Sequence, residues 1–162
     1  MANRFSTVVN RINKGPAALR SYLLTKVFNS QVKYAKTSNI KLISVTNKAV
    51  ELKIANKKRV QNHIGGVHAI AASLLAESAT GIVFGMNVPD THVPLLKSMK
   101  VDFQRRMVGD LTAHANLTDE QIQQIETQDK GDMLVAVTIT DESGQQPIAC
   151  FMEWAWVPKR RD

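Results

Sequence analysis

The sequence has little of what several functional classes require. It contains one cysteine, Cys150, which excludes an intramolecular disulfide, and the apolar pattern around it predicts a buried, inert thiol. No apolar run approaches the roughly 20 residues that a membrane-spanning helix needs. Charged and amide side chains interrupt the first residues, where a signal peptide would be apolar. GxGxxG, P-loop and Gly-x-Ser-x-Gly motifs are absent. We therefore expect a cytoplasmic protein.

The histidines give no sign of a metal site. No two of them have the i, i+4 spacing of helix-borne ligands, and no Cys or acid cluster completes a set. The four are His63, His68, His92 and His114. We expect neither a metal nor a cofactor.

The length and composition predict one folded domain with a basic surface. The chain has 162 residues, of which 44% are hydrophobic and 22% charged, enough to bury a real core. Its formal net charge is +7, and basic residues cluster in the N-terminal third and at residues 57–59, 105–106 and 159–161. No nucleic-acid recognition module accompanies them, so we predict no nucleic-acid partner. A solvated surface and contact with an anionic membrane surface are two explanations of this charge.

Hydrophobic periodicity divides the chain into a helical N-terminal extension, residues 1–36, and a mainly β domain, residues 37–162. Gly15-Pro16 separates two helices in the extension. Their predicted apolar faces comprise Phe5, Val8, Val9 and Ile12, then Leu19, Tyr22, Leu23, Val27 and Phe28. We predict later helices at 68–79 and 118–127, and strands at 40–46, 49–55, 81–86, 95–104, 111–117, 133–140 and 148–157. One apolar helix among antiparallel strands predicts an α+β fold in which a curved sheet wraps around a buried helix.

The segment 68–79 is apolar on all sides except at Glu77, its only acid. Desolvating an unpaired carboxylate costs several kcal/mol, so Glu77 must find a partner, shift its pKa or take part in chemistry. Asn62, Gly65-Gly66 and His68 lie just upstream, near the helix N-terminus, where free N–H groups suit a developing oxyanion. An acid, an amide and such a helix start are the components of acyl transfer. Taken singly, each residue also has a purely structural explanation, such as a turn or an ion pair.

The pattern Asn62-x-x-Gly65-x-x-His68, with Glu77 nine residues after the histidine, resembles the signature of hotdog-fold acyl-CoA thioesterases of the phenylacetyl-CoA thioesterase type. Segments 101–111 and 137–144 resemble strands and turns of the same family. The resemblance covers about residues 38–157. It implies a hotdog domain at 37–162, in a branch that carries an N-terminal helical extension.

The resemblance also implies roles. In that family the acid on the central helix is the nucleophile or general base, which would be Glu77. Asn62 would position the substrate carbonyl or water, and the N–H of Ala69, after His68, would polarise the thioester carbonyl. Gly65-Gly66 would border the substrate. The site would form between the subunits of a homodimer or homotetramer.

Two features depart from the family pattern. Ala69-Ile70 stands where the family usually has Gly-Gly, which reduces the room for an acyl group, and Glu77 stands where many relatives have Asp. Arg105 and Arg106, which end a strand beside the expected site, are our candidates for contacts to coenzyme A phosphates. We predict a thioesterase acting on acyl-CoA or acyl-carrier thioesters. The alternatives are a hotdog domain that binds acyl groups or CoA without turnover, and a basic structural or membrane-surface protein.

Overall fold

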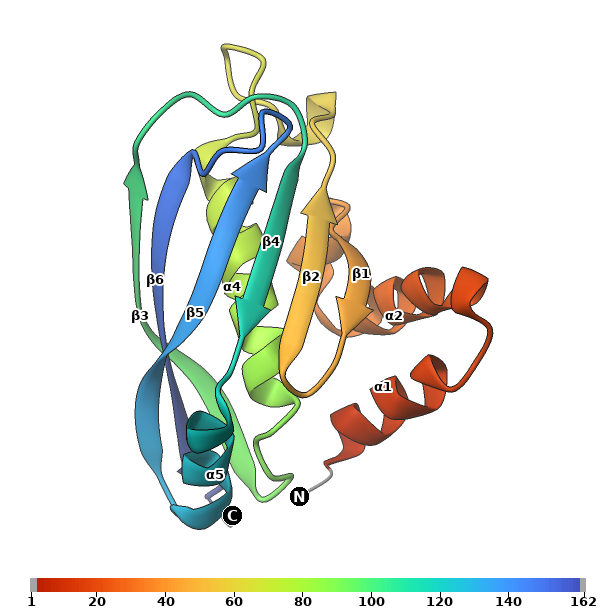
Figure 1. Ribbon diagram of the computed structural model, residues 1–162, viewed down its shortest axis with the longest axis vertical. Coiled ribbons are helices and arrows are strands. Elements are labelled where there is room, and N and C mark those ends of the chain that lie inside the picture. The colour runs from red at the N-terminus through yellow and green to blue at the C-terminus, as the bar shows by residue number, and fades with distance from the viewer. Residues whose placement is uncertain (1–2, 161–162) are drawn as a thin grey trace.

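The structure, a computed structural model, describes residues 3–160. Six strands form one antiparallel sheet in the order β1-β2-β4-β5-β6-β3, and the sheet curls around one long helix, α4 (Figure 1). The strands are β1 Lys41–Val45, β2 Ala49–Ile54, β3 His92–Phe103, β4 Leu111–Asn116, β5 Gly131–Asp141 and β6 Ile148–Pro158. The helices are α1 Arg4–Asn13, α2 Ala17–Gln31, α3 Lys33–Thr37, the short 3₁₀ helix η1 Lys58–Val60, α4 Ala69–Gly85 and α5 Asp119–Thr127. The predicted hotdog arrangement is thereby confirmed. Residues 1 and 2 of the predicted extension, and residue 161 of the C-terminal basic run, lie outside the described part.

The central helix is longer than predicted. We expected a strand at 81–86, and this is wrong, because α4 continues through Gly85. Gly81 and the β-branched residues after it favour a strand locally. The structure shows a different reason for a glycine at position 81. A Cβ there would lie 2.8 Å from two ring atoms of Trp154, so the missing side chain lets the indole of β6 pack against the helix. The indole N–H of Trp154 donates to the hydroxyl of Thr80 at 2.9 Å, which satisfies the polar atom of this buried ring.

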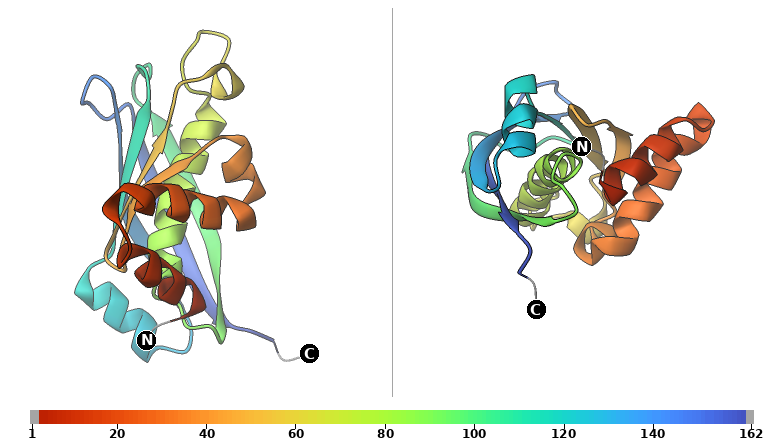
Figure 2. Two further views of the ribbon diagram at one scale, coloured as in Figure 1. Left: turned by 90° about the vertical axis from the view of Figure 1, so that its right-hand side faces the viewer. Right: turned by 90° about the horizontal axis from the view of Figure 1, so that it is seen from below.

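One edge of the sheet is covered. The strand β1 lies at that edge, and α2 packs along it (Figure 2). The Ser21 hydroxyl donates to the carbonyl of Leu42 at 2.6 Å, and the Leu42 N–H donates to the Thr25 hydroxyl at 2.9 Å. These side chains satisfy backbone groups that an edge strand leaves open. In the view from below in Figure 2, the sheet surrounds α4 and the helices α1 and α2 lie outside it on one side.

The opposite edge is open. Its strand, β3, has 12 residues, and in residues 3–160 no strand pairs with its outer side. Pro94 lies in this strand, which is tolerated at an edge because the missing N–H removes no ladder bond there. Several apolar side chains near this edge stay exposed, among them Met99 on β3 (52% exposed) and Phe151 on the neighbouring β6 (47%). Within the single chain, the outer face of β6 therefore stays partly exposed.

The predicted apolar faces of the first two helices are only partly right. The break at Gly15-Pro16 is confirmed, but Val8 is exposed, and in α2 the buried leucine is Leu24 while Tyr22 is 63% exposed. The reason is that α2 turns Ser21 and Thr25 toward the edge of β1, which moves Leu24 into the core. No helix in residues 3–160 is both long enough and apolar enough to cross a bilayer.

Candidate active site

The glycine turn before α4 is built by Asn62. Its side-chain oxygen accepts hydrogen bonds from the backbone N–H groups of Ile64, at 3.0 Å, and of Gly66, at 3.1 Å. The backbone N–H of Asn62 donates to the Gly66 carbonyl at 2.9 Å. Gly65 has φ +78°, in the left-handed region that favours glycine. Because both hydrogen-bond partners of the Asn62 side-chain oxygen are N–H donors, the turn fixes which way the amide group is oriented. The NH₂ group of Asn62 is the part left to contact a ligand.

The start of α4 has one backbone donor capped and one left available. His68 is the N-cap residue, and its Nδ1 accepts the N–H of Ile70 at 3.1 Å. This requires Nδ1 to be unprotonated, so Nε2 carries the proton in the neutral ring. In the described part of the chain, the Ala69 N–H has no acceptor, as expected for the first turn of a helix. That N–H therefore points out of the helix start as an available donor with the positive end of the dipole behind it.

Glu77 lies on the one stripe of α4 that the sheet does not cover. Ile70, Leu74, Glu77 and Gly81 follow each other at helical spacing and are all exposed or half-buried, while the rest of the helix is largely buried. Burial raises the pKa of the Glu77 carboxyl, and a long contact from the Ser78 hydroxyl, 3.4 Å, opposes this only in part. In the single chain the Glu77 side chain is therefore half-buried rather than buried.

Within one chain, Glu77 and the helix start do not meet. Ala69 and Glu77 are eight positions apart, so they lie about 12 Å apart along the helix axis. No hydrogen bond joins the Glu77 carboxylate to Asn62 or His68 in residues 3–160. Both ends of the site nevertheless lie on the same uncovered stripe, where Ile70 is 53% exposed.

The two arginines have different positions. The Arg106 guanidinium donates to the carbonyl of Ile64 at 2.8 Å, which places it beside the glycine turn. The Arg105 guanidinium instead binds Asp141 at 2.8 Å, and the Asp141 side chain is fully buried. Although burial disfavours the charge, hydrogen bonds from Arg105, Ser143 and Val108 hold the pKa of the Asp141 carboxyl well below its usual range. This places Arg105 in a fold-supporting ion pair and leaves Arg106 next to the site.

Sequence reasoning missed two features near Glu77. One is a cavity of about 460 Å³ that Glu77 lines together with side chains from α1 and α2. The other is Asn3, which joins the first helix to the end of α4. Neither residue spacing nor periodicity predicted that the N-terminal helices approach this part of α4. Across the described residues, no group of three or more His, Cys, Asp or Glu is placed to hold a metal ion.

Comparisons with known proteins agree with this fold. The family described as "Domain of unknown function (DUF4442)" matches residues 20–157. A Pseudomonas aeruginosa protein of unknown function, described with the words "Probable Thioesterase", superposes with a TM-score of 0.77 at 24% identity, covering 85% of this chain and 95% of that one. A Haemophilus influenzae thioesterase superposes with a TM-score of 0.67 at 12% identity, covering 83% of this chain and 88% of that one. A Silicibacter pomeroyi thioesterase family protein superposes with a TM-score of 0.65 at 14% identity, covering 89% of this chain and 100% of that one. The comparison with curated proteins gave no match.

Proposed function

The chain belongs to the family described as Domain of unknown function (DUF4442), and on that premise we propose that it is a thioesterase that hydrolyses acyl-CoA or acyl-carrier thioesters. The observation that carries the proposal is the uncovered stripe of α4. It combines one carboxylate, Glu77, with an available backbone donor at Ala69 and an otherwise apolar surface. Thioesterases occur among the proteins of the same fold, which supports the reaction class.

The chemistry follows from these groups. The ionised Glu77 carboxylate takes a proton from water as the water oxygen attacks the thioester carbonyl carbon. The negative charge that develops on the carbonyl oxygen is stabilised by the Ala69 N–H and the helix dipole, and the Asn62 NH₂ orients the carbonyl or the water. The tetrahedral intermediate then collapses, the C–S bond breaks, and Glu77 returns the proton to the departing thiolate. The raised pKa of Glu77 suits this proton exchange, because it brings the pKa closer to neutral pH.

The proposal needs two copies of the chain. The groups at Ala69 and Glu77 are about 12 Å apart in one chain, too far to act on one carbonyl. Pairing of two open β3 edges would bring the uncovered stripes of two α4 helices together. Glu77 of one copy would then face Asn62 and Ala69 of the other. Exposed apolar side chains along β3 and the helix stripe, such as Met99 and Ile70, support a homodimer formed in this way. The basic Arg106 beside the glycine turn is the residue we assign to the nucleotide end of coenzyme A.

A mixing experiment tests both the residues and the shared site. Glu77→Gln keeps the shape of the side chain but removes the base, and should lower turnover of an acyl-CoA panel by roughly 10²–10⁴-fold. Asn62→Asp keeps an oxygen that can hold the turn, and it replaces the NH₂ donor with a second carboxylate oxygen that also brings a negative charge. Each variant alone should be nearly inactive, with free thiol followed by a trapping dye.

Mixing the two variants after subunit exchange should restore activity to about one quarter of the wild-type level. Half of the dimers are then mixed, and each mixed dimer has one of its two sites intact. No recovery in a mixture shown to contain mixed dimers would place the site within one chain. Full activity of Glu77→Gln would remove Glu77 from the mechanism.

A second candidate function is binding of acyl groups or CoA without turnover. Ile70 favours it, since its exposed side chain stands beside the helix start where the family pattern has glycine. Tight binding of acyl-CoA by the wild type without release of thiol would support this alternative.

A further inference from the structure

The cavity beside Glu77 has one wall that the hotdog domain does not provide. The cavity measures about 460 Å³, within the range of about 300–1,000 Å³ that is usual for small-molecule sites. Glu77, Gly81 and Ile82 of α4 line one side, with Trp154 of β6 beyond them. The other side is formed by Phe5 of α1 and by Val27, Phe28 and Val32 at the end of α2. The surface is mainly apolar, and its charged or ionisable side chains are Glu77, Asp90, His92 and Lys159.

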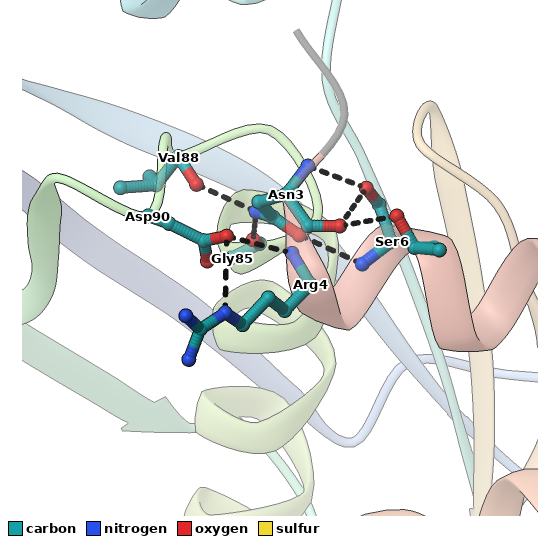
Figure 3. A network of polar contacts seen from close by, with 7 residues as sticks. Asn3, Arg4, Ser6, Gly85, Val88 and Asp90 are labelled. Atoms are coloured by element: carbon teal, nitrogen blue, oxygen red, sulfur yellow. Dashed lines mark hydrogen bonds and ion pairs between the residues drawn. The ribbon is translucent and has the colours of Figure 1, made fainter.

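A polar network holds this wall in place (Figure 3). Asn3 caps α1, because its side-chain oxygen accepts the N–H of Ser6 at 2.7 Å. The NH₂ group of Asn3 turns the other way and donates to the carbonyls of Gly85, at 2.7 Å, and of Val88. The Gly85 carbonyl lies in the last turn of α4, where backbone carbonyls have no hydrogen-bond partner within the helix. Asn3, only 5% exposed, thus joins the start of α1 to the end of α4.

The neighbouring contact strengthens the connection. The backbone N–H of Arg4 donates to the carboxylate of Asp90 at 3.1 Å, in the loop that leads into β3. Figure 3 shows Asn3 and Arg4 reaching from the first turn of α1 to this loop and to the end of α4. The helix α1 is therefore fixed at the end of the cavity that lies furthest from Glu77. Gly85 and Glu77 are eight residues apart, so the cavity runs about 12 Å along α4.

We propose that α1 and α2 form the outer wall of an acyl-chain pocket and set the length of the acyl group that the protein accepts. This rests on the proposed function, since Glu77 marks where the thioester carbon lies. With the carbonyl at Glu77, the apolar cavity takes the hydrocarbon, and the junction at Asn3 closes its far end. An extended chain advances about 1.3 Å per carbon with C–C bonds of about 1.5 Å, so about 12 Å accommodates on the order of nine or ten carbons.

Val27 is the position that tests the wall. It is half-buried on α2 and lines the cavity. Val27→Phe fills the cavity and Val27→Ala enlarges it, while Leu19→Phe makes the same kind of change on the exposed side of the same helix. Each buried methylene contributes about fourfold in affinity, equivalent to about 0.8 kcal/mol.

The measured quantity is the ratio of kcat/KM for decanoyl-CoA to that for butyryl-CoA. Val27→Phe should lower this ratio by about tenfold or more, which corresponds to about two excluded methylenes. Val27→Ala should shift the preference toward lauroyl-CoA and longer esters, and Leu19→Phe should leave the ratio at its wild-type value. Displacement of a fluorescent fatty acid by free fatty acids of four to sixteen carbons measures the same length dependence without turnover.

The two assays separate this inference from the proposed function. Hydrolysis with a length ratio that neither Val27 variant changes would overturn the wall and leave the thioesterase intact. A length preference in displacement that follows Val27, with no hydrolysis of any ester, would support the wall and reject the thioesterase. Identical displacement profiles in all four proteins would overturn the inference regardless of turnover.

Discussion

Replacing Arg105 with Ala should destabilise the fold rather than weaken substrate binding. Four donors hold the Asp141 carboxylate: the Arg105 guanidinium at 2.8 Å, the Val108 N–H at 2.9 Å, and the N–H and hydroxyl of Ser143 at 3.0 and 2.6 Å. Removing the arginine takes away the only positive charge among them and leaves a fully buried anion with three neutral donors. Loss of a charged hydrogen bond costs about 1.5–3 kcal/mol, and leaving a buried charge without its partner about 3–5. Because three donors stay, we expect Arg105→Ala to lower the free energy of unfolding by about 2–4 kcal/mol.

The assay is thermal unfolding, with Arg106→Ala as the matched variant. In a domain of this size, 1 kcal/mol shifts Tm by about 2–4 °C, so Arg105→Ala should lower Tm by about 5–15 °C. Arg106 is exposed, and its removal should change stability by less than about 0.5 kcal/mol. Arg106→Ala should instead raise KM for CoA esters more than for short thioesters that lack the nucleotide.

The pH dependence gives an independent check. The pKa of the Asp141 carboxyl is lowered in the folded state from an ordinary value of 3.8. Its contribution to stability is therefore present above pH 3.8 and is lost as the pH falls below it. In the Arg105→Ala variant, the loss of stability on lowering the pH below 3.8 should be smaller than in the wild type. An Arg105→Ala protein with unchanged Tm and a selective rise in KM for CoA esters would refute the reasoning and restore Arg105 to the binding site.

Two further predictions concern α4. The raised pKa of Glu77 means that the folded state disfavours its charge, a penalty present above the unfolded value of 4.5 and relieved as the pH falls toward it. Glu77→Gln should therefore have a higher Tm than the wild type at pH 7, with a difference that shrinks toward pH 4.5; a constant difference would contradict this. Gly81→Ala gains helix propensity of up to about 1 kcal/mol but forces a methyl against the Trp154 ring, costing about 1–3 kcal/mol, so urea unfolding should show net destabilisation. Gly85→Ala, whose methyl meets nothing within 4 Å, is the control and should not be destabilised.

The strands were largely predictable because their signals are local. Alternating apolar residues predicted β2 and β6. The helix predicted at 118–127 matches α5, which begins with a capping box formed by Thr118 and Gln121. The end of α4 was not predictable in this way. Glycine followed by β-branched residues looks like a break into a strand, and only the packed Trp154 ring explains why glycine continues the helix.

For the candidate site, the sequence proposed residues but gave no information on their surroundings. The spacing of Asn62, His68 and Glu77 pointed to one region, whereas the partner of Arg105 did not follow from the sequence. Asp141 lies 36 residues away, in a segment that reads as an ordinary turn. Asn3 likewise reads as a simple N-cap, because its second set of contacts, to Gly85 and Val88, depends on how the first helix packs against α4.

The hydrogen bonds from α2 to β1 have a consequence for how the sheet can grow. A sheet with two free edges can accept strands at both, and copies of it can add to one another without limit, as in a fibre. Here Ser21 and Thr25 occupy the backbone groups of Leu42, so within residues 3–160 strand addition is available at β3 alone. Growth by edge pairing must then stop at two copies. Mutations that detach α2 would remove this limit, and their first effect would be insoluble protein rather than altered catalysis.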